Sequence, residues 1–271
     1  MPRIEYPRAA PLVPGRLVRR YKRFFVDVEL TDGTVVTAHC ANTGAMEGLT
    51  RPGLAVWLSA STNPERRLAW TWELVAADGR LYGAHTAMPN QLVRRLLTEG
   101  RLEWLGSFDE WAAERVYGEE GRSRVDFWLR RGRRQTFIEV KNCHLVYPDG
   151  RAYFPDAVSE RATKHLHELA REVAAGHRAE VLFVCQTGPV KSLRPSDLHD
   201  PAFAAAARTA KAAGVRFSAL VVAHRPDAIE ILDRVPVDLK PYPTERVAKW
   251  RAAVGRTKVR PLPQENKRDP G

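Results

Sequence analysis

The strongest constraint on the fold is a change of sequence pattern near residue 88. Before that point, short apolar stretches alternate with the links "TDG", "NTG", "RPG" and "ADG". Glycine in these links accepts a positive φ and proline fixes φ, so each link can reverse the chain. The apolar stretches are "RFFVDVELTDG", "TVVTAHC", "GLAVWLSAS", "RRLAWTWELV" and "GRLYGAHT". Several short strands at this spacing predict a small barrel or sandwich, and we expect an OB-like β-barrel over residues 1–88.

From residue 89 onward, helical and strand patterns alternate. Segment 107–118, "SFDEWAAERVYG", begins with Ser107, has Glu110 three residues later and ends at Gly118, which is the pattern of a capped helix. Further helices are expected at "NQLVRRLLTEG", from Ser159 to Gly176 and from Asp200 to Gly214, with strands at "SRVDFWL", "QTFIEVKNCHL", "RAYFP", "AEVLFVCQTG", "RFSALVVAH" and "AIEIL". This order predicts an α/β domain with a mixed sheet flanked by helices over residues 89–240, followed by a basic tail at 241–271.

The positive charge is concentrated at the two ends of the chain. The net charge is +11 and the isoelectric point is near 9.9. Residues 1–23 hold seven Lys or Arg and one acid, residues 241–271 hold eight against three, and the remainder is balanced. Basic segments attract polyanions through the release of counterions, so we expect a nucleic acid as partner. Basic ends that serve solubility alone are the alternative.

The apolar stretches and the cysteines indicate in which cellular compartment the protein works. No stretch of 18 apolar residues occurs, and the N-terminal segment has no apolar core of a secretion signal. We therefore expect a cytoplasmic protein with no membrane association. Cys40, Cys143 and Cys185 are far apart and form no C-x-x-C pair, so reduced thiols are expected.

Candidate chemistry lies in the strand "QTFIEVKNCHL". Side chains alternate along a strand, so Glu139 and Lys141 share one face. Such a pair is common on solvated strands. Here, however, the turn "RRGRR" joins this strand to one that carries Asp126 between Val125 and Phe127, and Glu114 lies in the helix expected before it. Carboxylates that converge repel one another, and a divalent cation relieves the repulsion.

These residues predict phosphodiester hydrolysis. Asp126, Glu139 and the backbone carbonyl of Val140 are expected to hold Mg²⁺ or Mn²⁺, with Glu114 bound through a water. Lys141 would orient or deprotonate the attacking water and offset the charge of the phosphate. Acids that only form salt bridges are the structural alternative.

The same residues carry a resemblance to known families. Glu114, Asp126 and "EVK" resemble the PD-(D/E)XK nuclease pattern, and the stretches "AHCANTGAMEGL", "VWLSASTNPERRLAWTWELV", "SRVDFWL", "IEVKN" and "FPDAVSERATKHLHEL" resemble the sugar fermentation stimulation protein A family. The resemblance implies an OB-like domain joined to a PD-(D/E)XK restriction-endonuclease-like domain, DNA binding and regulation of sugar utilisation genes. It also implies the catalytic set Glu114, Asp126, Glu139 and Lys141, with Lys164 and His165 as accessory residues.

Two functions follow from these expectations. The first is a DNA-binding protein with a metal-dependent nuclease site. The alternative is a non-catalytic DNA-binding regulator of sugar metabolism genes with the same fold. RNA as the partner and a homodimer both stay open. Trp57, Trp70 and Trp72 are expected either to stack bases on the barrel or to lie in its core. The expected DNA contacts are Arg19, Arg20, Lys22, Arg23, Arg66, Arg67, Arg131 and Arg133.

Overall fold

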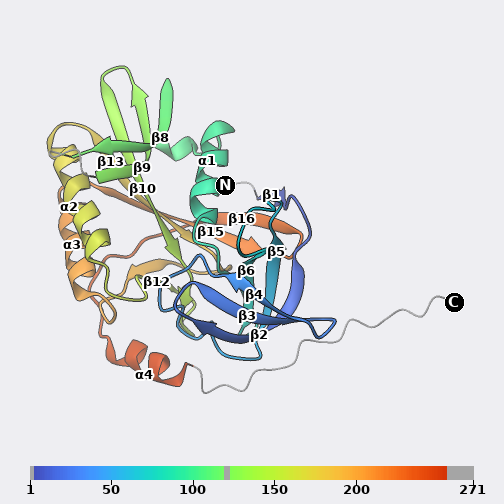
Figure 1. Cartoon of the computed structure of the whole chain (residues 1–271). Helices are drawn as coiled ribbons and strands as arrows, with labels where there is room; N and C mark the ends of the chain where they lie inside the picture. Colours follow the sequence, from blue (N-terminus) through green and yellow to red (C-terminus); the bar gives the residue numbers. More distant parts are fainter. Residues whose placement is uncertain (1–2, 119–122, 255–271) are drawn as a thin grey trace.

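The computed structural model describes residues 3–118 and 123–254. In Figure 1 an N-terminal barrel lies beside a larger α/β domain. None of the helices in these residues has the length and apolar character needed to cross a membrane.

The barrel begins after residue 12 and confirms the OB-like prediction. Its strands follow the order β4-β3-β2-β5-β6-β7, and an additional pairing of β4 with β6 closes the cylinder. Leu17, Val26, Val28 and Trp72 fill the interior. The strands are β2 (Val13–Tyr21), β3 (Phe25–Leu30), β4 (Val35–His39), β5 (Ala55–Ala60), β6 (Trp70–Ala77) and β7 (Arg80–Gly83).

The first strand, β1 (Ile4–Pro7), lies outside the barrel. It pairs antiparallel with β16 (Ala228–Val235), with Ile4 opposite Ile231. Tyr6 is buried in the core of the α/β domain. The sequence placed residues 1–88 together in the barrel, but the alternation of Ile4 and Tyr6 lets this segment cover the edge of the other sheet instead.

The α/β domain is built on a seven-stranded mixed sheet with the order β1-β16-β15-β13-β10-β9-β8. Strands β10, β13 and β15 run parallel, and the outer pairs are antiparallel. This confirms the mixed sheet expected from the sequence. Its further strands are β8 (Glu110–Tyr117), β9 (Ser123–Arg131), β10 (Arg134–Cys143), β13 (Arg178–Cys185) and β15 (Arg216–His224).

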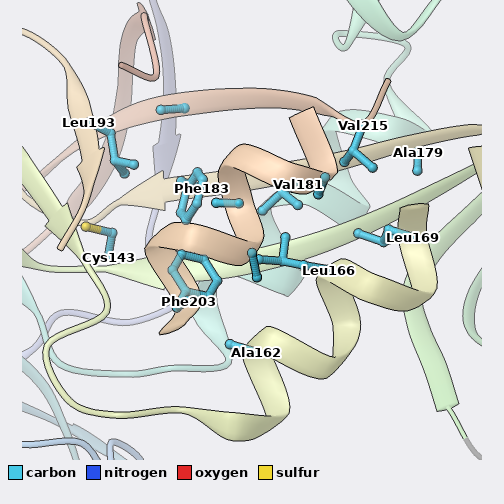
Figure 2. Close-up of a cluster of buried hydrophobic side chains, with 14 of the residues drawn as sticks. Cys143, Ala162, Leu166, Leu169, Ala179, Val181, Phe183, Leu193, Phe203 and Val215 are labelled. Carbon is cyan, nitrogen blue, oxygen red and sulfur yellow. The ribbon is translucent and has the colours of Figure 1, made fainter. Parts of the chain in front are cut away.

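Helices cover both faces of this sheet. Helix α1 (Met88–Thr98) packs Leu92 and Leu96 against Ile138 and Leu182. Helices α2 (Glu160–Ala174) and α3 (Pro201–Ala212) pack on the opposite face, where Figure 2 shows Leu166, Phe203 and Phe183 in one apolar cluster. The caps are those expected: Ser159 Oγ accepts from the N–H of Ala162, and Asp200 accepts from the N–H of Phe203.

The helix expected at residues 107–118 is wrong, because this segment forms the edge strand β8. It pairs with β9 from Glu110 opposite Arg130 to Tyr117 opposite Ser123. The ring of Trp111 lies 6.1 Å from that of Phe127, so the strand packs against the sheet core. Tertiary pairing therefore outweighs the local capping pattern.

A smaller unit joins the barrel and the α/β domain. Strands β11 (Leu145–Val146), β12 (Ala152–Phe154) and β14 (Leu193–Pro195) form a three-stranded sheet. Helix α4 (Glu245–Ala253) packs Val247 and Trp250 against this unit, with Trp250 stacked on Tyr147 at 6.0 Å. The first part of the segment expected as a basic tail is thus folded, and residues 255–271 lie outside the described part of the chain.

Candidate active site

Asp126 and Glu139 meet where the β9–β10 hairpin opens. The two strands pair from Arg131 opposite Arg134 to Phe127 opposite Ile138, and the register ends there. The N–H of Val140 donates to Asp126 Oδ2 at 2.7 Å, so the carboxylate takes the place of a partner strand. From α1, Asn90 Nδ2 donates to Asp126 Oδ1 at 2.9 Å. Where the hairpin opens, the Asp126 carboxylate is therefore held beside Val140 of β10.

Glu139 is held from two directions. Lys141 Nζ donates to Glu139 Oε1 at 2.7 Å, and the same oxygen forms a hydrogen bond with Nδ1 of His165 on α2. Glu139 is only 4% exposed. Its other oxygen, Oε2, is buried and has no hydrogen-bond partner among the described residues. One buried carboxylate oxygen therefore lacks the donor that such a group requires.

The pKa values of the two acids move in opposite directions. Burial and then the negative charge of Glu139 raise the pKa of Asp126 to about 6. Burial would raise the pKa of Glu139 as well, but the hydrogen bond from His165 and the charge of Lys141 lower it below its ordinary value. The site thus holds one carboxylate, Glu139, whose ionised form is favoured, and a second one, Asp126, that keeps its proton to a higher pH than usual.

The structure brings together Asp126, Glu139, Lys141 and His165, and leaves two expected residues apart. Glu114 is about half exposed and forms an ion pair with Arg124 at 3.6 Å. The pairs Ala113–Phe127 and Arg115–Val125 flank Glu114 in one continuous register, but Glu114 itself, with a φ of 55°, is not among the paired residues. Lys164 is 59% exposed and lies 3.5 Å from the carboxylate of Glu168. Neither contact directs the side chain to Asp126 or Glu139.

Two residues of this region were missed in the sequence. Asn90 lies 36 positions before Asp126, and no motif connects them. Glu168 is buried on α2, where it accepts from Ser123 Oγ at 2.6 Å and from the Tyr117 hydroxyl at 3.4 Å. The one available signal was its position three residues after His165, on the same face of α2.

The donor set fits a hard divalent cation with few protein ligands. Asp126, Glu139 and the carbonyl of Val140 are the protein groups available, and the unpartnered Glu139 Oε2 is the oxygen that most needs a cation. Within residues 3–118 and 123–254, no group of three or more His, Cys, Asp or Glu side chains could hold a metal. Mg²⁺ commonly uses one or two carboxylates and takes its other ligands from water and phosphate, so two carboxylates suffice.

The arginines and lysines expected to contact DNA fall into two groups. Arg20 Nη2 donates to the carbonyls of Arg23, Asn42 and Gly44, so this side chain holds a barrel loop. Arg19 Nε donates to Asp27 at 2.7 Å. The others are exposed on the surface: Lys22, Arg23, Arg66, Arg67, Arg131 and Arg133.

The tryptophans divide in a similar way. Trp72 is fully buried and its indole N–H donates to the carbonyl of Leu74. Trp70 packs against the barrel core, and Trp57 is half-buried. Trp70 and Trp72 therefore belong to the barrel core and do not form a base-stacking face.

The fold and site define a class: an OB barrel joined to a restriction-endonuclease-like domain whose opened hairpin carries an aspartate and an E-x-K strand. Family models agree, because the SfsA N-terminal OB domain matches residues 18–83 and the sugar fermentation stimulation protein RE domain matches residues 87–228. The chain belongs to the sugar fermentation stimulation protein family.

Individual relatives cover most of the chain. A sugar fermentation stimulation protein homolog from Geobacter metallireducens is 47% identical over 229 residues, which are 84% of this chain and 98% of the relative. A homolog from Maricaulis maris is 48% identical, with 81% and 97% covered. Among solved structures, that of Pyrococcus furiosus SfsA in complex with Ca²⁺ has the same fold, with a TM-score of 0.77, 23% identity and coverage of 85% and 97%.

Proposed function

We propose that this protein binds nucleic acid and hydrolyses phosphodiester bonds with a divalent cation, Mg²⁺ or Mn²⁺, at Asp126 and Glu139. The observation that carries the proposal is the buried Glu139 Oε2, which has no donor among the described residues. A buried carboxylate oxygen without a partner costs free energy, and a cation would supply the missing partner. A cation would also lower the raised pKa of Asp126, because it offsets the repulsion from Glu139.

The chain's own residues have distinct parts in this proposal. Asn90 and the N–H of Val140 orient Asp126, and His165 orients Glu139. Lys141 retains some exposure, so its ammonium group can approach a phosphate oxygen and the attacking water. A bound cation lowers the pKa of its water and polarises the phosphate.

The comparisons support the binding of a divalent cation. The Pyrococcus furiosus relative was solved in complex with Ca²⁺, an ion that binds oxygen ligands. The family name connects the relatives with sugar fermentation, and we extend that connection to this chain as a role in the control of sugar utilisation.

A non-catalytic DNA-binding regulator is the second candidate. The observation that favours it is the ion pair of Lys141 with Glu139, which gives this lysine a structural role without any substrate. The basic segments at both ends of the chain would serve binding in either case.

Cleavage of plasmid and of single-stranded oligonucleotides in Mg²⁺, Mn²⁺ or EDTA tests the proposal. We expect cleavage only with a divalent ion. Lys141→Ala should lower the rate by about 10²- to 10⁴-fold, the range of one proton-transfer residue, while nucleic-acid affinity stays near that of the parent. The matched control is Lys211→Ala, which removes an exposed lysine of α3. Cleavage by Lys141→Ala at the parental rate would contradict the role of this lysine, and specific binding without cleavage in any divalent ion would establish the regulator.

A further inference from the structure

An aromatic row crosses the outer surface of the barrel. Tyr21 on β2 is opposite Phe25 on β3, and Phe25 is opposite His39 on β4. Their neighbours Val26 and Ala38 point into the barrel core, so Phe25 and His39 face outward. The rings of Tyr21 and Phe25 are stacked, with centroids 5.5 Å apart and planes inclined by 21°. All three rings are half-buried and present part of their surface to solvent.

The turn between β2 and β3 adds an exposed ring to this row. Phe24 is 48% exposed, and it is the sole aromatic among the strongly exposed large apolar side chains of the described residues. Lys22 and Arg23 precede it, both with positive φ. A turn that holds an aromatic ring in solvent directly after two cations is suited to stacking on a base next to a phosphate.

Cations surround the row on its other side. The loop between β5 and β6 carries Arg66 and Arg67, both exposed. This loop leads into β6, where Trp70 lies opposite Ala38 and Thr71 opposite His39, so the loop adjoins the row. The charge of Arg66 is accordingly one cause, after burial, of the lowered pKa of His39. No ion pair to Lys22, Arg66 or Arg67 is found in the part of the chain that the structure describes.

Acidic groups do not cancel this charge. Asp27 lies on the same face, but Arg19 neutralises it at 2.7 Å. The guanidinium of Arg19 also lies over the ring of Tyr21 at 4.9 Å. Glu29 is exposed at the opposite end of β3 from the turn. Glu65 is exposed in the loop of Arg66 and Arg67 and offsets one of the four charges of Lys22, Arg23, Arg66 and Arg67. The surface around the row is therefore positive and partly aromatic.

We infer that this face binds single-stranded nucleic acid, with Phe24, Tyr21, Phe25 and His39 stacking on bases and with Lys22, Arg23, Arg66 and Arg67 contacting phosphates. Bases in a duplex are stacked on each other, whereas single-stranded bases offer their faces to aromatic side chains. OB barrels bind oligonucleotides on the face of their second and third strands and on the adjoining loops. Here those parts are β3, β4 and the loops at 22–24 and 61–69. The inference rests on the proposed function and names the form of its substrate.

Contacts lead from this face toward the acidic site. Arg23 Nε donates to the carbonyl of Thr43 at 3.2 Å, and in the same loop the N–H of Met46 donates to Asp156 at 3.0 Å. Asp156 lies three residues before Ser159, the cap of α2, and His165 follows on that helix. The loop that contains Thr43 and Met46 therefore connects the barrel face with the segment that leads into α2, the helix that orients Glu139.

The test is fluorescence anisotropy of the full chain in EDTA, which prevents cleavage, with a labelled oligothymidylate and a duplex of equal length. We expect the single strand to bind at least about tenfold more tightly. Phe24→Ala should weaken single-strand binding by about fivefold or more and leave duplex binding unchanged, because stacking on one base is lost. This side chain is exposed, so the variant should fold, as circular dichroism would verify.

The charge test uses a matched pair of triple variants. Replacing Lys22, Arg66 and Arg67 by alanine should flatten the salt dependence of single-strand binding by a slope of about 2, as expected for three lost phosphate contacts. Replacing Lys191, Lys211 and Lys240, which are exposed on the α/β domain, removes the same charge and should change the slope by less than 1.

Equal affinity for duplex and single strand in the parent, or an unchanged affinity in Phe24→Ala, would overturn this inference. Metal-dependent cleavage by the same preparation would show that the proposed function survives. Failure to bind either nucleic acid would overturn both.

Discussion

A buried aspartate of the barrel and a half-buried aspartate of the α/β domain have opposite surroundings. Asp27 on β3 of the barrel accepts three hydrogen bonds, from Arg19 Nε at 2.7 Å, Thr37 Oγ1 at 2.8 Å and the Tyr21 hydroxyl at 3.2 Å. Burial alone would raise the pKa of Asp27, but these donors lower it below its ordinary value. Asp126 on β9 of the α/β domain accepts from two neutral amides, and its pKa is raised to about 6.

The comparison separates a structural carboxylate from a candidate catalytic one. The barrel provides Asp27 with a cation and two hydroxyl groups, so its charge is compensated within the fold. The α/β domain places Asp126 near Glu139. Among its described residues no cation contacts Asp126 directly, since Lys141 and His165 both contact Glu139. Strongly perturbed carboxylates of this kind are concentrated at functional sites, because the fold leaves their charge for a ligand to compensate.

Substitution of the two aspartates should change stability in opposite directions, which is the largest effect we expect. Asp27→Asn should lower the free energy of unfolding by about 1–3 kcal/mol, because hydrogen bonds to a charged group are lost. Asp126→Asn should raise it at pH 7 without metal by at most roughly 2 kcal/mol, since a shift of about two pKa units is removed but one of the two N–H donors loses its acceptor oxygen. Urea denaturation in EDTA measures both, and shifts of the same sign would break the comparison.

Variation of pH should sharpen the same contrast. The folded pKa of Asp126 lies above its unfolded value, so its stabilising contribution is full below about pH 4 and is lost as the pH rises through 6. The parent should therefore lose up to roughly 3 kcal/mol relative to Asp126→Asn between pH 4 and pH 7.

Asp27 has the reverse dependence, because its folded pKa is lowered. Its contribution is present above the unfolded pKa near 4 and declines as the pH falls below it. The deficit of Asp27→Asn should accordingly shrink in acid. Denaturation series at several pH values would check both trends, and a deficit that grows in acid would refute the assignment of Asp27.

The smallest effect is expected for Glu114. Its carboxylate is about half exposed and pairs with Arg124, so Glu114→Gln should change stability by less than about 1 kcal/mol. The affinity of Glu114→Gln for Mn²⁺ should stay within about twofold of the parent, because Glu114 pairs with Arg124 and not with a ligand of the metal, and large losses are expected only for groups that bind the metal or hold its ligands. A loss of tenfold or more would place Glu114 in the site through a bridging water.

Much of the fold follows from local sequence signals. The hairpin around "RRGRR", the Ser159 and Asp200 caps and the turns of the barrel depend on residues close together in the sequence, and all are present in the structure. The segment at 107–118 shows the limit of such signals. Its capping pattern is local and predicts a helix. The pairing with β9 is formed with another segment, and it makes this segment a strand.

The site was predictable only in part. Asp126, Glu139 and Lys141 lie on one hairpin, so strand alternation brings them close, and His165 was suggested by family resemblance. The contribution of Asn90 depends on how α1 packs over the opened hairpin, which no short motif records. Arg20 was expected from the sequence to contact DNA. In the structure it donates to three carbonyl groups of its own barrel.

Calorimetric titration of Mn²⁺ into the metal-free protein tests the central claim most directly. The account predicts one ion per chain, with an affinity that rises as the pH passes 6, because the proton of Asp126 must leave before the ion binds. Asp126→Asn and Glu139→Gln should each weaken binding by at least about tenfold, the lower bound for loss of a supporting or direct ligand, whereas Asp27→Asn should bind as the parent does. Parental affinity in both site variants would contradict the account.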